Sequence, residues 1–379
     1  MDAFFAAVEE RDKPRLKGLP IVVGADPKNG LGRGVVSTAN YKAREYGIHS
    51  AQPISIAWRL SEEAVRKGKP AAVFLEPNFR AYSETSGKIM DYLRTKADIV
   101  EEASIDEAYL EISSPKICHP DPPAGGEGSL QDSSSDSGRT QNDLWNDAMK
   151  LAKEIKKNIK ATQKLTCSIG IGPNKLIAKI AASRQKPDGL TIVKPDGVQN
   201  FLDPLSVKEI PGIGPKSQEV LVREGVRTIQ DLRKLSKEKL NELFGKWGLD
   251  MYERAQGIDE SPVTAEYEAK SIGEQETYEK DTLDSSFLLS RIKELSKSVY
   301  DRTRKERFLF KTVSITVRFH DFETKTRAHT LDKPSADITT LEHQTLQLFL
   351  PFLDNRENPE KKLIRLLGVR VEKLSAPVK

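Results

Sequence analysis

The sequence has 379 residues, of which 37% are hydrophobic and 31% charged, and its formal net charge is only +4. This length predicts several domains, and the lack of an apolar run of about 20 residues excludes a membrane-spanning protein. The two cysteines, Cys118 and Cys167, stand far apart without metal-ligand spacing, which excludes a disulfide framework and a zinc site.

The first segments predict short strands and helices with polar side chains at their ends. Acidic residues and no basic leader accompany the short apolar run of Met1 to Glu10, so no secretory signal is predicted and a cytoplasmic location is expected. Leu19 to Val23 and Val35 to Ser37 read as strands, separated by the glycine-rich turn Gly30 to Gly34. In the helix that follows, Tyr41 and Arg44 share a face and suit a phosphate chain; a structural ion pair is the alternative.

A predicted hairpin comes next and carries adjacent acids. Ile99 to Ser104 and Ala108 to Ile112 read as strands, with Ile105-Asp106-Glu107 between them. Adjacent carboxylates converge only where a strand turns or bulges. Carboxylate oxygens are ligands for Mg²⁺, although exposed turn carboxylates are the common alternative.

The segment Ser113 to Asn142 is dominated by Pro, Gly, Ser and Asp, and predicts a flexible insert with almost nothing to bury. Its Cys118-His119 pair offers too few ligands for a metal site. Beyond it, the pattern predicts a helix, a strand and a second helix at Leu144 to Ile159, Leu165 to Ile171 and Asn174 to Ser183, followed by a turn at Lys186 to Gly189.

Pro211-Gly212-Ile213-Gly214-Pro215-Lys216 is typical of a helix-hairpin-helix. Its glycines would let backbone N–H groups approach a phosphate, while a plain helix connection is the alternative. Ser261 to Ile272 reads as a linker to a closing α+β domain with strands at Thr312 to Phe319 and Leu366 to Val371. The basic cluster Arg302 to Arg307 fits either polyanion contact or helix-end solvation.

Taken together, these motifs resemble a Y-family translesion DNA polymerase of the bacterial DNA polymerase IV type. The resemblance rests on Asp2 to Glu9, Ser37 to Arg44, Ser104 to Leu110, Gly170 to Ala182, Lys186 to Gly189, Pro211 to Gly214 and Leu367 to Val371. It implies an α+β multidomain, right-hand polymerase. The implied domains are a palm (1–4 and 72–193, with the flexible insert 113–142), small fingers (5–71), a helix-hairpin-helix thumb (194–262) and an α+β little finger (263–379).

The resemblance also implies site residues. Asp106 and Glu107 would be the catalytic carboxylates that hold two Mg²⁺ ions, and Met1 could add a backbone carbonyl. Phe5 would be the steric gate against a ribose 2′-hydroxyl, with Phe4 lining the sugar pocket, although core packing is the alternative for both rings. The remaining implied contacts are Thr38, Tyr41, Arg44 and Lys186 to the triphosphate, and Gly212, Gly214 and Lys216 to DNA.

One departure concerns the first carboxylate. The family motif runs Val-Asp-Met-Asp and its first Asp is a metal ligand, whereas this sequence begins at the Met, so that Asp2 matches the second Asp. A truncated or misplaced start and a true variant that binds DNA without efficient synthesis are both compatible, and the first is favoured because every other motif is present. A third hypothesis is a nucleotide cyclase that uses the same two-metal chemistry. The helix-hairpin-helix argues against it, because a cyclase shares the carboxylate hairpin but not the DNA-binding elements.

The expected activity is template-directed, low-fidelity DNA synthesis for lesion bypass, by a monomer that binds primer-template DNA and deoxynucleoside triphosphates and no membrane. A sliding clamp is a possible partner, but the end Ser375 to Lys379 has no clamp-binding peptide. Gln347 to Phe352 has a similar composition, yet its helical spacing predicts buried core.

Overall fold

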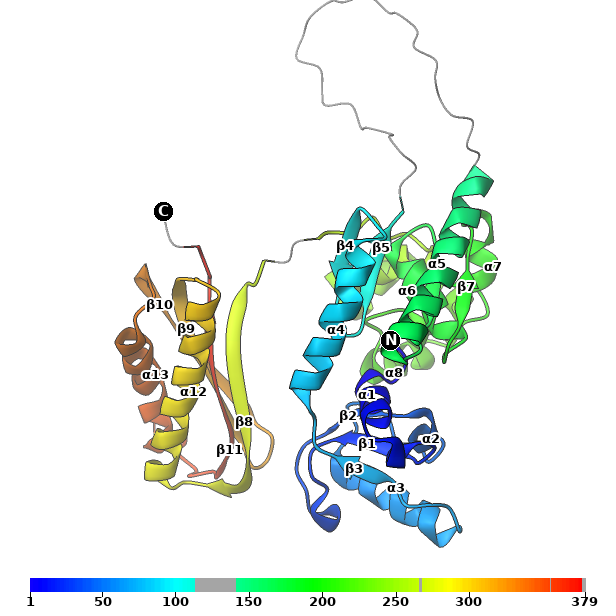
Figure 1. Ribbon diagram of the computed structural model, residues 1–379. Coiled ribbons are helices and arrows are strands. Elements are labelled where there is room, and N and C mark those ends of the chain that lie inside the picture. The colour runs from blue at the N-terminus through cyan, green and yellow to red at the C-terminus, as the bar shows by residue number, and fades with distance from the viewer. Residues whose placement is uncertain (113–140, 266–267, 355, 377–379) are drawn as a thin grey trace, which may run out of the picture. The chain divides into compact units, whose positions relative to one another are not determined.

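The computed structural model describes residues 1–112, 141–265, 268–354 and 356–376. They form two compact units, each described here by itself (Figure 1). The first comprises residues 1–24, 36–51 and 60–266, and the second comprises 25–35, 52–59 and 267–379. The predicted insert 113–142 lies outside the described residues except at its end, where Gln141 and Asn142 are already helical.

A three-stranded sheet of order β2-β1-β3 lies near the start of the chain. The apolar stretch Ile-Val-Val-Gly forms β1 (Ile21–Gly24), which is buried throughout and pairs antiparallel with β2 (Val36–Ala39) and parallel with β3 (Val73–Leu75). Because β3 pairs with β1, the sheet crosses the predicted boundary at residue 71. The helices of this region are α1 (Phe4–Asp12), α2 (Tyr41–Arg44) and α3 (Ile54–Arg66).

The predicted hairpin is confirmed. β4 (Ile99–Glu102) pairs antiparallel with β5 (Ala108–Glu111), and β6 (Ile169–Ile171) pairs in parallel with β7 (Leu190–Ile192). The amphipathic helices α4 (Phe79–Arg94) and α5 (Gln141–Gln163) bury one face in a core shared with α1 and β1. Two backbone bonds then place the start of the chain between the strand pairs: the Met1 amino group donates to Asp106 O (2.6 Å), and Asp2 N donates to Thr166 O (3.2 Å).

Short helices follow in the range predicted for the thumb. They share a core with α6 (Lys175–Arg184), whose first turn is capped by the Asn174 side chain accepting from Ile177 N (3.0 Å). The helices are α7 (Val198–Leu202), α8 (Pro215–Arg223), α9 (Ile229–Arg233), α10 (Lys237–Phe244) and α11 (Lys246–Ala255). The start of the predicted linker is bound to α6 and β4, because Lys175 Nζ donates to Pro262 O (2.9 Å) and Thr264 N donates to Glu101 Oε2 (3.0 Å).

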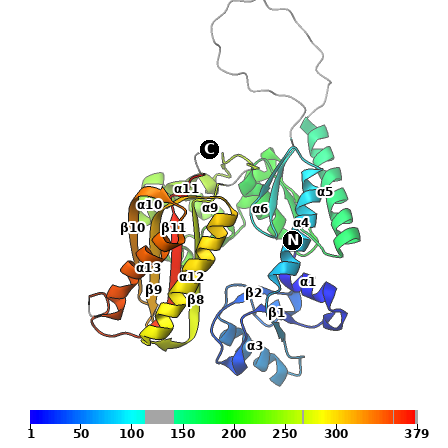
Figure 2. The same ribbon diagram turned by 60° about the vertical axis from the view of Figure 1, so that its left-hand side comes forward.

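In the second unit, a four-stranded sheet of order β10-β9-β11-β8 carries helices α12 and α13 on one face (Figure 2). The core between them includes Phe349 and Phe352, which confirms buried core for these two residues of the segment Gln347 to Phe352, whereas Gln347 and Leu350 are exposed. The strand β8 begins at Ser271, so the last two residues of the predicted linker belong to the sheet. The elements are β8 (Ser271–Thr282), α12 (Ser285–Lys305), β9 (Phe310–Phe319), β10 (Thr324–Ser335), α13 (Ile338–Leu353) and β11 (Ile364–Glu372). Across the described ranges, no helix combines the length and hydropathy that a bilayer crossing requires.

Candidate active site and DNA-binding elements

The turn between β4 and β5 presents the two adjacent carboxylates. Ala103 N and Ser104 N both donate to Glu107 O (3.0 and 3.1 Å), which closes the turn, and Ser104 Oγ donates to Asp106 Oδ1 (2.8 Å). Because the chain reverses here, Asp106 and Glu107 are not forced onto opposite faces as they would be in a regular strand. The hairpin therefore permits the two carboxylates to converge, as the sequence pattern required.

Lys179, on α6, forms an ion pair with Glu107 (Nζ to Oε2, 2.7 Å). Burial raises the pKa of Glu107, but the hydrogen bond and charge of Lys179, together with the charges of Lys186 and the amino terminus, outweigh it and hold the pKa below its usual value. Glu107 is thus ionised at neutral pH. Lys179 was missed in the sequence, although its motif segment, Gly170 to Ala182, was singled out.

The Met1 backbone contacts the hairpin through its amino group, which donates to Asp106 O. The Met1 carbonyl as a metal ligand stays a prediction. Two protein carboxylates completed by substrate phosphate oxygens are an ordinary donor set for one Mg²⁺ ion. A second ion needs a further anionic donor. In the described part of the chain, no group of three or more His, Cys, Asp or Glu side chains is placed to hold a metal.

Tyr41 and Arg44 lie on α2, which begins where β2 ends. The Asn40 side chain caps this helix by accepting from Ala43 N (3.0 Å) and also accepts from Ile21 N (2.9 Å), so it ties α2 to β1. The Arg44 guanidinium lies 4.7 Å from the Tyr41 ring centroid, and its Nε donates to Ala39 O (3.0 Å). Burial and the nearby Asp2 carboxylate raise the pKa of Tyr41. Thr38 lies on β2 opposite Val23.

The two phenylalanines at the start of α1 have different surroundings. The ring of Phe5 stacks on Tyr82 (centroids 4.3 Å apart, 9° between planes), and Tyr82 Oη donates to the buried Glu9 (2.7 Å). The Phe5 ring is therefore held on one face and is partly exposed. Phe4 is 2% exposed and packs in the core, which is the alternative that the sequence left open. Phe4 and Phe5 point in different directions because successive helical residues are about 100° apart, and the burial of Phe4 leaves its ring almost no free surface.

Comparison with known proteins supports a single family. Residues 1–183 match the impB/mucB/samB family, residues 269–379 match the C-terminal domain of that family, and residues 208–259 match the thumb domain of DNA polymerase-iota. The chain is 40% identical over 374 residues to DNA polymerase IV 2 of Methanosarcina mazei, covering 99% of this chain and 90% of that protein. It is 37% identical over 376 residues to DNA polymerase IV of Streptococcus agalactiae, covering 99% and 92%.

The chain belongs to the Y-family DNA polymerases, within the DNA polymerase IV group. Solved structures agree. A Y-family DNA polymerase chimera, Dbh-Dpo4(243-245)-Dbh, is 27% identical with a TM-score of 0.77, covering 99% of this chain and 97% of that one. The insertion ternary complex of Dbh DNA polymerase is 27% identical with a TM-score of 0.62 and the same coverage. The family and the α+β polymerase fold predicted from the sequence are confirmed.

The helix-hairpin-helix of this Y-family polymerase contains two glycines, Gly212 and Gly214, with different surroundings. Gly212 has φ of +96°, and a Cβ there would lie 2.5 Å from Trp247, so only glycine fits. Gly214 caps the nine-residue helix α8 with extended backbone, and a Cβ there would meet nothing within 4 Å. Lys216 is exposed on the first turn of α8. The second glycine is therefore free for close approach of a ligand to the backbone.

Replacing Gly214 by alanine should leave thumb stability unchanged and weaken primer-template binding several-fold, because the new methyl group obstructs a phosphate at the helix N-terminus. Gly197→Ala is the matched control, since its Cβ would also meet nothing within 4 Å. Thermal unfolding and fluorescence anisotropy with labelled duplex would measure both effects. Equal DNA affinity in the two variants would identify the turn as a plain helix connection.

A further surface, which the sequence did not reveal, is the sheet face of the second unit opposite α12 and α13. Alternate β9 residues point into the core, so Thr312, Ser314, Thr316 and Arg318 lie on the other face, where Thr312 and Ser314 are buried and Thr316 and Arg318 are half-buried. Their cross-strand neighbours include Gly368, Arg370, Thr326 and Thr330. Small side chains flanked by guanidinium groups suit the approach of a phosphate backbone.

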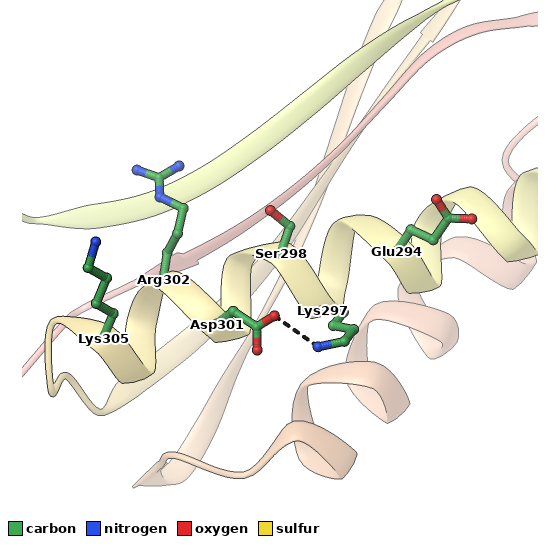
Figure 3. A pocket seen from close by; sticks show the side chains of 6 residues that line it. All are labelled: Glu294, Lys297, Ser298, Asp301, Arg302 and Lys305. Carbon is green, nitrogen blue, oxygen red and sulfur yellow. Dashed lines mark hydrogen bonds and ion pairs between the residues drawn. The ribbon is translucent and has the colours of Figure 1, made fainter. Parts of the chain in front are cut away.

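The basic cluster Arg302 to Arg307 lies at the end of α12, where Figure 3 shows Arg302 and Lys305 extending away from the helix while Asp301 faces Lys297. Lys297 pairs with Asp301 (2.9 Å), and Arg302 Nη1 donates to Gly273 O (3.3 Å). The Arg304 guanidinium lies 5.9 Å from the Tyr300 ring centroid. None of these contacts pairs a cation of the cluster with a carboxylate, so polyanion contact and helix-end solvation both stay predictions.

Proposed function

We propose that the chain is a DNA-directed DNA polymerase that extends a primer opposite damaged template bases. Family membership supports the activity, and one structural observation carries it: the Asp106-Glu107 turn lies beside Lys179 and Lys186, within reach of their charges. Carboxylates for a metal and cations for a triphosphate are the elements that phosphoryl transfer requires.

In the proposed reaction, the primer 3′-hydroxyl attacks the α-phosphate of the incoming deoxynucleotide and pyrophosphate leaves. Two Mg²⁺ ions, when bound, would activate the hydroxyl and neutralise the leaving group. Asp106 and Glu107 would hold them, with the backbone of Met1 adjacent. Tyr41, Arg44 and Lys186 would bind the triphosphate, Thr38 would lie next to it, and Phe5 would contact the sugar.

DNA would be held outside the reacting centre. Gly212, Gly214 and Lys216 of the thumb hairpin would contact the duplex backbone. Arg318 and Arg370, on the sheet face opposite α12 and α13, would supply a second surface. These contacts read phosphates and not bases, which suits an enzyme that must tolerate altered templates. The helix-hairpin-helix and this face have no role in a nucleotide cyclase.

Primer extension with Mg²⁺ tests this function and its alternative. The 379-residue chain is compared with a form preceded by Val-Asp, because a further carboxylate beside Asp106 and Glu107 would complete the donor set. We expect extension by the longer form to be about 10²-fold faster or more. Duplex binding without extension by either form would instead support a DNA-binding relative, and cyclic nucleotide release from ATP or GTP without DNA would support a cyclase.

A further inference from the structure

The loop that carries Lys186 has almost no buried side chain. It follows α6, and residues 183–188 are all exposed. Hydrophobic packing therefore cannot fix where the Lys186 ammonium points, and the orientation of the loop depends on its polar contacts.

Those contacts begin at the start of the chain. Asp2 is 3% exposed, and its Oδ2 accepts from Asp188 N (2.9 Å) while its Oδ1 accepts from Ser168 Oγ (2.7 Å). Ser168 Oγ in turn accepts from Gly189 N (3.1 Å). Since Met1 is bonded to Asp106, Asp2 joins the carboxylate hairpin to the Lys186 loop.

Lys156, on α5, holds the same loop from the other side. Its Nζ donates to Asp188 Oδ1 (2.6 Å), to Cys167 O (2.7 Å) and to Gly189 O (3.2 Å), which uses all three donors of an ammonium group. The hydrogen bond from Lys156 lowers the pKa of Asp188, so the Asp188 carboxylate stays ionised at neutral pH. Lys156 is 17% exposed, whereas Lys160 is 67% exposed and lies 3.5 Å from Asp188.

The loop also cannot relax towards α6. A Cβ on Gly189 would lie 2.5 Å from Gln185 O, so the backbone at Gly189 already packs directly against the residue that follows α6. The polar atoms of Asp188 and Gly189 are thus held by three elements: the N-terminal segment, β6 with the residues before it, and α5.

We infer that Lys156, together with the Asp2–Ser168 pair, is a positioning residue that holds the loop of Lys186 so that its ammonium meets the triphosphate of the incoming nucleotide. The inference rests on the proposed function, in which Lys186 binds that triphosphate. Lys156 does not touch the nucleotide itself; it acts through Asp188 and Gly189.

The test measures nucleotide binding without turnover. The Kd of the next correct deoxynucleotide is measured with Mg²⁺ on a dideoxy-terminated primer-template, for Lys156→Met, Lys186→Met and the double variant. Each single change should raise this Kd by about tenfold, and the double variant should match Lys186→Met, because residues that act through one another are not additive. Lys156→Arg should recover most of the affinity, and Lys157→Met, an exposed neighbour on α5, should match the unchanged chain.

Two results would overturn the inference: an unchanged Kd in Lys156→Met where Lys186→Met raises it, or a double variant whose Kd is the product of both effects. If Lys186→Met itself leaves the nucleotide Kd unchanged, the proposed function fails at this residue, and the positioning role is then tested by a second measurement. Hydrogen exchange at the Asp188 and Gly189 amides should quicken in Lys156→Met and not in Lys157→Met. Equal exchange in the two variants would refute the positioning role whatever Lys186 binds.

Discussion

Replacing Asp106 by asparagine is expected to reduce Mg²⁺-dependent primer extension by roughly 10³-fold, measured in the form preceded by Val-Asp. Asparagine keeps the size of the side chain and can still accept from Ser104 Oγ, so the turn should persist. What is lost is an anionic oxygen donor. Losing an outer partner of a metal ligand already costs about 10–100-fold, and losing the ligand itself should cost more.

The matched control is Glu111→Gln, which removes a carboxylate from the same hairpin at the end away from the turn, opposite Ile99. It should extend primers normally. Both variants should bind duplex and unfold thermally as the parent does. Near-normal extension by Asp106→Asn, with the control equally active, would remove Asp106 from the catalytic centre and the metal role with it.

Replacing Phe5 by alanine should lower the preference for deoxynucleotides over ribonucleotides by about 10²-fold. The Phe5 ring is held flat against Tyr82, so it cannot swing aside to admit a 2′-hydroxyl. A pocket that no longer collides with that hydroxyl cannot strongly reject it. The ratio of kcat/KM for matched dNTP and rNTP measures the change.

Phe79→Ala controls for loss of aromatic packing. The Phe79 ring packs edge-on against the Phe5 ring, with the ring centroids 6.0 Å apart, and Phe79 is 60% exposed. This variant should leave sugar discrimination near its original value. If Phe5→Ala kept full discrimination, or if Phe79→Ala lost as much, the Phe5 ring would be a packing residue and not the gate.

Local patterns in the sequence were enough to predict several elements. The β4–β5 hairpin, the α6 helix and the helical segment that buries Phe349 and Phe352 follow from hydrophobic periodicity and turn residues, which act over a few positions. The order of short motifs identified the family. In the same way, the glycines of Pro211 to Gly214 predicted a turn, because φ of +96° at Gly212 is a local property.

The sequence alone determined the carboxylate turn, the family and the kinds of residue that its site contains, since these depend on neighbours in the chain. Only the tertiary structure decided which distant residues meet. Phe4 is buried although Phe5 beside it is not, and Lys179 pairs with Glu107 across 72 positions. Asp2 and Lys156 hold Asp188 across 186 and 32 positions of the chain. The physical reason is that such contacts depend on how helices and strands pack, and that packing leaves no periodic trace along the chain.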